Sequence, residues 1–102
     1  MKELDKTGFW NAVNSRGVVV VDFWAPWCGP CRALAPIMEQ VSQEIGNFAI
    51  VAKMSVDECP EIAEEFGILS IPTLIYFKNG KEIKRTTGMV TKADILSNAT
   101  SL

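Results

Sequence analysis

Two continuous apolar runs on either side of one amphipathic stretch limit the fold of this chain more than any other feature of its sequence. Residues 18–24 and 48–54 are apolar almost throughout, which is typical of strands that are buried on both faces of a parallel sheet. Between them, residues 31–44 carry apolar side chains at helical spacing, which predicts a helix. Strand, helix and strand in this order predict a βαβ unit, and therefore a sheet that is at least partly parallel.

Capping residues indicate two further helices outside this unit. Thr7 is a candidate N-cap for a helix over residues 7–14. Asp57 is a candidate N-cap for a short helix over residues 58–66, which Gly67 would end. One helix therefore precedes the βαβ unit and one follows it.

The C-terminal third of the chain predicts a hairpin and a last helix. Residues 74–77 and 83–87 flank Asn79-Gly80, and Asn-Gly between apolar runs is the strongest short hairpin signal. Residues 92–98 then predict a helix. The antiparallel hairpin makes the whole sheet mixed, with helices to cover both of its faces.

Length and charge exclude several classes of protein. With 102 residues the chain suits a single domain, residues 1–102. A net charge of −2 with dispersed lysines offers no basic surface for nucleic acid. No run approaches the roughly 20 apolar residues of a membrane span, and the polar start lacks a signal-peptide pattern. We therefore expect a cytoplasmic protein without nucleic-acid or membrane partners.

Cys28 and Cys31 are separated by two residues at the predicted junction of strand and helix. A pair at this spacing supplies half of a zinc site, or forms and breaks a disulfide. Zinc needs about four ligands, and the chain has no histidine and one further cysteine, Cys59, so we expect no metal site. The start of the helix would stabilise a thiolate on Cys28, and Pro30 suits the first helical turn.

Motifs over nearly the whole chain resemble those of the thioredoxin family. They are Asp22-Phe23-Trp24-Ala25-Pro26-Trp27-Cys28-Gly29-Pro30-Cys31, Pro36, Lys53, Ile71-Pro72-Thr73, Phe77-Lys78-Asn79-Gly80 and Gly88. The resemblance implies an α/β chain with the thioredoxin fold, in which a central mixed sheet is flanked by helices on both faces. Because the N-terminal segment is short, we expect the first edge strand to be reduced to a few residues, around 2–4, or to be missing.

Cys28 is the expected nucleophile, because it precedes the helix and its sulfur would be the more exposed of the two. It would open a substrate disulfide, and Cys31 would then displace the substrate from the mixed disulfide. Gly29 allows the backbone to turn tightly and Pro30 stiffens the loop. These two spacer residues resemble those of the reducing members of the family.

Asp22 is the one carboxylate inside an apolar strand, and burial should raise its pKa. The alternative is a strand-end residue that faces solvent. By resemblance Asp22 acts through a water as the base for Cys31. Lys53, in the neighbouring strand, is similar to the family's buried lysine near that carboxylate, although a strand-end lysine that reaches outward explains it equally well.

The resemblance also implies a docking surface beside the cysteines. Thioredoxins hold the proline at position 72 in the cis form, which leaves the Ile71 backbone free to pair with an extended substrate segment. The expected contact face comprises Trp27, Gly29, Pro30, Ile71, Pro72, Gly88 and Met89. Trp10 and Trp24 are expected in the core.

These expectations together describe a general protein-disulfide reductase whose redox group is the Cys28–Cys31 pair and which binds no cofactor. In this family an NADPH-dependent flavoprotein, thioredoxin reductase, recharges the pair, and the other partners are disulfide-containing target proteins. We expect a monomer. Two alternatives are a binding module or complex subunit that uses the same apolar face, and a specialised oxidase or isomerase. We expect an incidental or regulatory role for Cys59.

Overall fold

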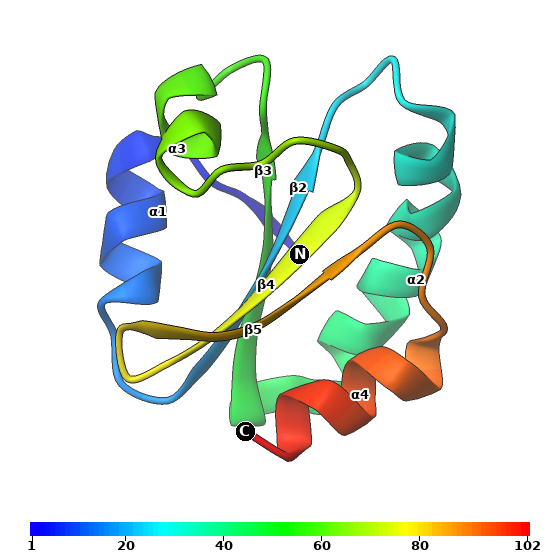
Figure 1. Ribbon diagram of the computed structural model, residues 1–102. Helices are drawn as coiled ribbons and strands as arrows, with labels where there is room; N and C mark the ends of the chain where they lie inside the picture. The colour runs from blue at the N-terminus through cyan, green and yellow to red at the C-terminus, as the bar shows by residue number, and fades with distance from the viewer.

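The computed structural model describes residues 1–102 as a five-stranded sheet covered by helices on both faces (Figure 1). The strands are β1 (Lys2–Glu3), β2 (Val18–Trp24), β3 (Ala49–Ser55), β4 (Thr73–Lys78) and β5 (Lys81–Thr87). The helices are α1 (Lys6–Val13), α2 (Gly29–Ile45), α3 (Pro60–Glu65) and α4 (Lys92–Thr100), with the 3-10 turn η1 (Gly46–Phe48) after α2. The element order confirms the predicted fold class.

The strands lie in the order β1-β3-β2-β4-β5, so the sheet is mixed. β3 runs parallel to both β1 and β2, whereas β4 is antiparallel to β2 and to β5. β1 is only two residues long, which confirms a first edge strand reduced to a minimum. The βαβ unit predicted from the two apolar runs is therefore the centre of the sheet.

Successive residues of β2 point to opposite faces of the sheet and build two separate cores. Val19 and Val21 pack in one cluster with Phe9 of α1 and Ile62 of α3. On the other face, Val18 and Val20 pack in a second cluster with buried side chains of α2 and α4, namely Leu34, Met38, Val41, Ile45, Ile95 and Ala99. Figure 1 shows the same division, with α1 and α3 on one side of the sheet and α2 and α4 on the other.

α2 begins earlier than predicted, at Gly29, and Cys28 is its N-cap. Pro30 lies in the first turn as expected, where its missing N–H leaves no donor unpaired. The predicted apolar stripe is the buried face of the helix. At 17 residues α2 is the longest helix, and neither it nor any other helix is long and apolar enough to cross a membrane.

Both predicted helix caps outside the βαβ unit are wrong. Asp5 caps α1, since its carboxylate accepts a hydrogen bond of 2.7 Å from the Gly8 N–H, and Thr7 lies inside the helix. α3 begins after Cys59 without a side-chain cap, and Asp57 lies in the turn before it. In the first case a carboxylate two residues upstream is the better cap. In the second, the predicted cap has another partner, described below.

The expectation that residues 48–54 are buried on both faces holds only for their second half. Phe48 and Ile50 are exposed, whereas Val51, Ala52 and Met54 are buried. The short β1 pairs only with the second half of β3. The first half of β3 is therefore an open edge of the sheet, and its alternate side chains reach solvent.

The hairpin between β4 and β5 has the predicted turn. Asn79 and Gly80 have φ angles of 50° and 86°, and two consecutive positive values define the tight turn that matches the twist of antiparallel strands. Asn79 also accepts a hydrogen bond of 2.8 Å from the Gly17 N–H. The hairpin is thereby tied to the loop before β2.

Candidate active site

The two cysteines of the Cys-x-x-Cys motif form a disulfide at the start of α2. Cys28 and Cys31 are 5.2 Å apart between their Cα atoms. The Cys31 N–H points at the Cys28 sulfur across 3.2 Å, in the position of a helix-capping hydrogen bond. This N–H and the positive end of the helix dipole would stabilise a thiolate on Cys28 once the disulfide is reduced.

Cys28 is the sulfur that a partner can reach. It is 6% exposed against 2% for Cys31. Cys28 also lines a groove of about 490 Å³, whereas Cys31 does not. The groove is lined by Trp27, Cys28, Gly29, Pro30, Val56, Ile68, Leu69, Ser70 and Ile71. Cys28 is therefore both the sulfur that a partner can reach and the N-cap of α2.

The loop before β4 forms the opposite wall of this groove, at the end of the sheet where β2 and β3 stop (Figure 1). The Ile71–Pro72 peptide is cis, as expected. The Ile71 carbonyl oxygen lies 3.8 Å from the Cys28 sulfur. A segment bound in the groove would therefore meet the cysteine and the Ile71 backbone together.

The other residues of the expected contact face lie at different depths. Pro72 is buried, and its carbonyl accepts a hydrogen bond of 2.8 Å from the Gly88 N–H, which joins the start of β4 to the end of β5. Gly88 is half-buried and Met89 is exposed, but neither lines the groove. Four residues of the expected face therefore line the groove, namely Trp27, Gly29, Pro30 and Ile71. The other three, Pro72, Gly88 and Met89, do not line it.

Trp27 is largely exposed, yet a hydrogen bond holds it in place. Its Nε1 donates to the Asp57 carboxylate at 2.9 Å. This bond is the alternative partner that removes Asp57 from its predicted role as a helix cap. It links the cysteine segment to the turn after β3.

Leu69 is a residue of the groove that sequence reasoning missed. Its side chain is 98% exposed, although it lines the groove beside Cys28. The residue lies between α3 and β4, in a loop without the periodicity that marks buried positions. A leucine exposed this fully, next to a reactive sulfur, suits contact with an apolar part of a partner.

Asp22 is buried in β2 on the face that α2 covers. It is 2% exposed, and its Oδ1 atom has no hydrogen-bond partner. Burial raises the pKa of this carboxyl from 3.8 to about 7, Lys53 opposes the rise and Glu3 adds to it. At neutral pH Asp22 is therefore poised between its acid and base forms, which is the condition for proton transfer.

Lys53 fits neither of its two predicted roles fully. It lies beside Asp22 in the register of β2 and β3. Its ammonium forms an ion pair of 3.8 Å with Glu3 and lies 4.7 Å from the centre of the Trp24 ring. No ion pair joins it to Asp22, and the side chain does not extend freely into solvent. Its charge nevertheless reaches Asp22 and lowers the pKa of that carboxyl.

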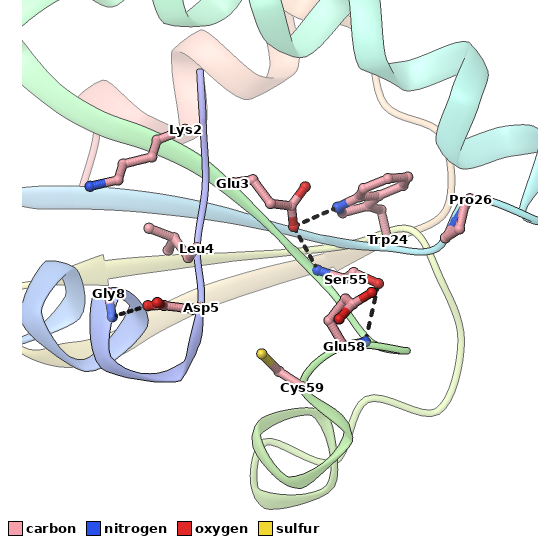
Figure 2. Close-up of a pocket in the computed structure, with 10 residues that line it drawn as sticks. All are labelled: Lys2, Glu3, Leu4, Asp5, Gly8, Trp24, Pro26, Ser55, Glu58 and Cys59. Carbon is pink, nitrogen blue, oxygen red and sulfur yellow. Dashed lines mark hydrogen bonds between the residues drawn. The ribbon is translucent and has the colours of Figure 1, made fainter.

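A second cavity, of about 600 Å³, lies at the β1 edge of the sheet and contains neither Cys28 nor Cys31 (Figure 2). Cys59 lines it as a buried free thiol. Desolvation, followed by nearby carboxylates, raises the pKa of this thiol, which disfavours the reactive thiolate. Trp24 also lines this cavity, but it is half-buried and packs against the cluster of Ala25, Cys28 and Cys31, so it lies at the margin of the core. Trp10 packs against the core cluster around Phe9.

Comparison with known proteins identifies relatives over almost the full length of the chain. The thioredoxin family model matches residues 1–101. The thioredoxin of Alicyclobacillus acidocaldarius is 45% identical over 92 residues, which are 90% of this chain and 88% of that protein. A bifunctional thioredoxin reductase/thioredoxin of Mycobacterium leprae is 46% identical over 90% of this chain, which spans only 20% of that longer protein. The structure of oxidised mitochondrial thioredoxin 3 from Saccharomyces cerevisiae superposes with a TM-score of 0.88 at 29% identity, over 100% of this chain and 95% of that one.

Proposed function

The chain belongs to the thioredoxin family and is a protein-disulfide reductase, and we propose that Cys28 and Cys31 are the pair that cycles between dithiol and disulfide. One observation carries this assignment: the two sulfurs are joined at the start of α2, and one of them lines an open groove. A disulfide at this place can be reached, opened and closed again. The whole domain, residues 1–102, serves to hold this pair.

The reaction runs as two thiol–disulfide exchanges. The Cys28 thiolate attacks one sulfur of a target disulfide, and the other target sulfur leaves as a thiolate and takes up a proton. Cys31 loses its proton and attacks the Cys28 sulfur, so the target is released as a dithiol and the Cys28–Cys31 disulfide forms. The target sulfur released in this second exchange also leaves as a thiolate and takes up a proton. Two electrons have then passed from this chain to the target. One of the two protons that the target takes up balances the one lost by Cys31, and the other comes from solvent, which received it when Cys28 ionised.

Asp22 acts in the second exchange, in which Cys31 must lose a proton. Its carboxyl is buried on the face of the sheet covered by the helix that begins at the cysteines, and its pKa lies near neutrality. A base with this pKa accepts a proton at physiological pH and returns it when the disulfide is reduced again. Lys53 adjusts this proton affinity through its charge.

Targets bind in the groove as extended segments. The Ile71 backbone pairs with the target main chain, and Trp27, Gly29 and Pro30 contact its side chains. Pro72, Gly88 and Met89 extend the contact face beyond the groove. Contacts of this kind are made mostly to backbone and to apolar surface, so one groove accepts many targets.

Thioredoxin family members act with a reductase and with disulfide targets, and we propose that an NADPH-dependent thioredoxin reductase recharges this chain. The Mycobacterium leprae relative, whose name joins the two proteins, supports this pairing. We further propose that the chain acts as a monomer without a bound cofactor. The cytoplasm suits it, because that compartment keeps an unpaired thiol such as Cys59 reduced.

Replacing Cys31 by serine should trap targets on Cys28. The first exchange still proceeds, but no thiol remains to resolve the mixed disulfide. Affinity capture of Cys31→Ser from a cell lysate should recover proteins that dithiothreitol releases. A double variant that also carries Cys28→Ser is the matched control and should recover none. Equal recovery by both variants would contradict the assignment of Cys28 as the nucleophile.

Replacing Leu69 by serine should weaken target binding without slowing the chemistry. Losing about 1 kcal/mol of apolar contact corresponds to a KM about fivefold higher, with kcat unchanged. Ile83→Ser is the matched control, because Ile83 is also an exposed apolar residue but lies on β5, outside the groove. Steady-state reduction of a disulfide-bonded protein measures both constants. Equal KM values for the two variants would remove Leu69 from the docking surface.

A further inference from the structure

Three ionisable residues of neighbouring strands form one row across the sheet. The parallel register places Asp22 of β2 beside Lys53 of β3, and Lys53 beside Glu3 of β1. Residues paired in this way share a face of the sheet. The buried carboxyl and the edge carboxylate therefore lie on either side of a single ammonium group.

Glu3 lies at the outer end of this row, and two hydrogen bonds, to Trp24 and to Ser55, hold its carboxylate (Figure 2). Its Oε2 atom accepts a hydrogen bond of 3.0 Å from the Ser55 N–H and one of 3.3 Å from the Trp24 Nε1. Its Oε1 atom lies 3.8 Å from the Lys53 Nζ. One carboxylate thus contacts β2 and both ends of the Lys53–Ser55 segment of β3, although β1 itself is only two residues long.

These contacts decide where the Lys53 ammonium lies. It pairs with Glu3 and lies over the Trp24 ring, and Glu3 also holds that ring through its indole N–H. Asp22, the other carboxyl beside Lys53, forms no ion pair with it and has an Oδ1 atom without a partner. The Lys53 ammonium therefore pairs with the exposed carboxylate of Glu3 and not with the buried carboxyl of Asp22.

We propose that Glu3 is a positioning residue for the redox reaction: it holds Lys53 and Trp24 at the β1 edge and so keeps the Lys53 ammonium away from Asp22. The inference rests on the proposed role of Asp22 as the acid and base of the exchange. Glu3 itself lies outside the groove that Cys28 lines. It acts mainly by holding Lys53, with a smaller direct effect of its own charge on Asp22.

The charges that face Asp22 are few, so each has a large effect. Two charged residues act on it, Lys53 of β3 and Glu3 of β1. The neighbours on the other elements carry no charge: Cys28 and Cys31 are joined in a disulfide, and the β4 residue paired with Asp22 is Leu74. An ammonium that moved to Asp22 would favour the carboxylate and lower its pKa. Glu3 prevents this by competing for the ammonium, and its own negative charge also disfavours the carboxylate.

Glu3→Gln tests the proposal, because the amide oxygen can still accept both hydrogen bonds while the charge is lost. The Asp22 carboxyl carbon is followed by NMR across a pH titration of the oxidised protein. We expect its pKa to fall by about half a unit or more, and the pH profile of disulfide reduction to shift the same way. Glu58→Gln is the matched control, since Glu58 lines the same cavity as Glu3 but does not contact Lys53. This control should leave the pKa of Asp22 unchanged.

A second background shows whether Glu3 acts through the lysine. In Lys53→Gln protein, the added Glu3→Gln change should move the Asp22 titration by less than half as much as it does in the wild type. An equal movement in both backgrounds, or none in either, would overturn the proposal. The titration needs no redox activity, so it also separates the two claims: an Asp22→Asn protein with unchanged exchange rates would overturn the function of Asp22, and not the role of Glu3 in its protonation.

Discussion

Replacing Cys28 by serine should abolish protein-disulfide reduction. A serine hydroxyl at the N-cap of α2 can keep the hydrogen bond to the helix, but it cannot form the mixed disulfide on which the reaction depends. Reduction of insulin by the variant should proceed no faster than with dithiothreitol alone. Circular dichroism should show an unchanged fold, because serine is close to cysteine in size.

Cys59→Ser is the matched control for this loss. Cys59 is a buried thiol that does not line the groove, and its surroundings raise its pKa, so this variant should keep wild-type turnover. If Cys28→Ser still supported a partner's activity while the control behaved like wild type, the chain would act as a binding module and not as a reductase. Loss of turnover in both variants would give Cys59 a role that its position does not suggest.

Replacing Asp22 by asparagine should stabilise the oxidised protein, and the gain should grow with pH. Burial raises the pKa of Asp22 from 3.8 to about 7 in the folded state. The folded state therefore holds the proton more tightly than the unfolded chain does. The stability that this proton contributes is fully present below the unfolded pKa, and it is lost as pH rises through the folded pKa.

The size of this effect follows from the two pKa values. Each pKa unit corresponds to about 1.4 kcal/mol, so the interval from 3.8 to about 7 amounts to roughly 4 kcal/mol at about pH 8. An asparagine side chain does not ionise, so the variant does not lose this stability as the pH rises. We expect similar unfolding free energies for the two proteins in acid and a gap of up to that size in alkali.

Urea unfolding of both oxidised proteins at several pH values measures this difference. Glu64→Gln is the control, because Glu64 is an exposed carboxylate without an ion pair and should leave the pH dependence as it is. Thiol–disulfide exchange by Asp22→Asn should also slow, since the acid–base group is gone. Parallel stability curves with unchanged exchange rates would mean that Asp22 ionises freely and takes no part in catalysis.

Local sequence patterns determine the central elements of the fold. The first apolar run gives β2 with the bounds expected, because a strand buried on both faces needs an unbroken run. Asn79-Gly80 gives the predicted turn, because both residues tolerate positive φ angles. The Cys28-x-x-Cys31 spacing places both sulfurs at one helix start, which also depends only on residues near in sequence.

Predictions failed where two local signals competed or where a neighbour was far away in sequence. Thr7 and Asp5 were both able to cap α1, and only the structure shows which side chain meets a free N–H. Asp57 had the pattern of a cap but bonds to Trp27, thirty positions away. Ile50 belongs to an apolar run, yet it is exposed because β1 is too short to cover it.

The sequence by itself determined which atoms could carry the chemistry, because a thiol pair and a buried carboxyl are recognised by residue type and local pattern. The tertiary structure decided what surrounds them. Leu69 reaches the groove only because the loop before β4 folds beside α2. Glu3 meets Lys53 only because β1 adds to the outer edge of β3. Such contacts depend on strand order and register, which arise from the packing of the whole sheet. They therefore cannot be recognised from the few residues around Leu69 or Glu3 alone.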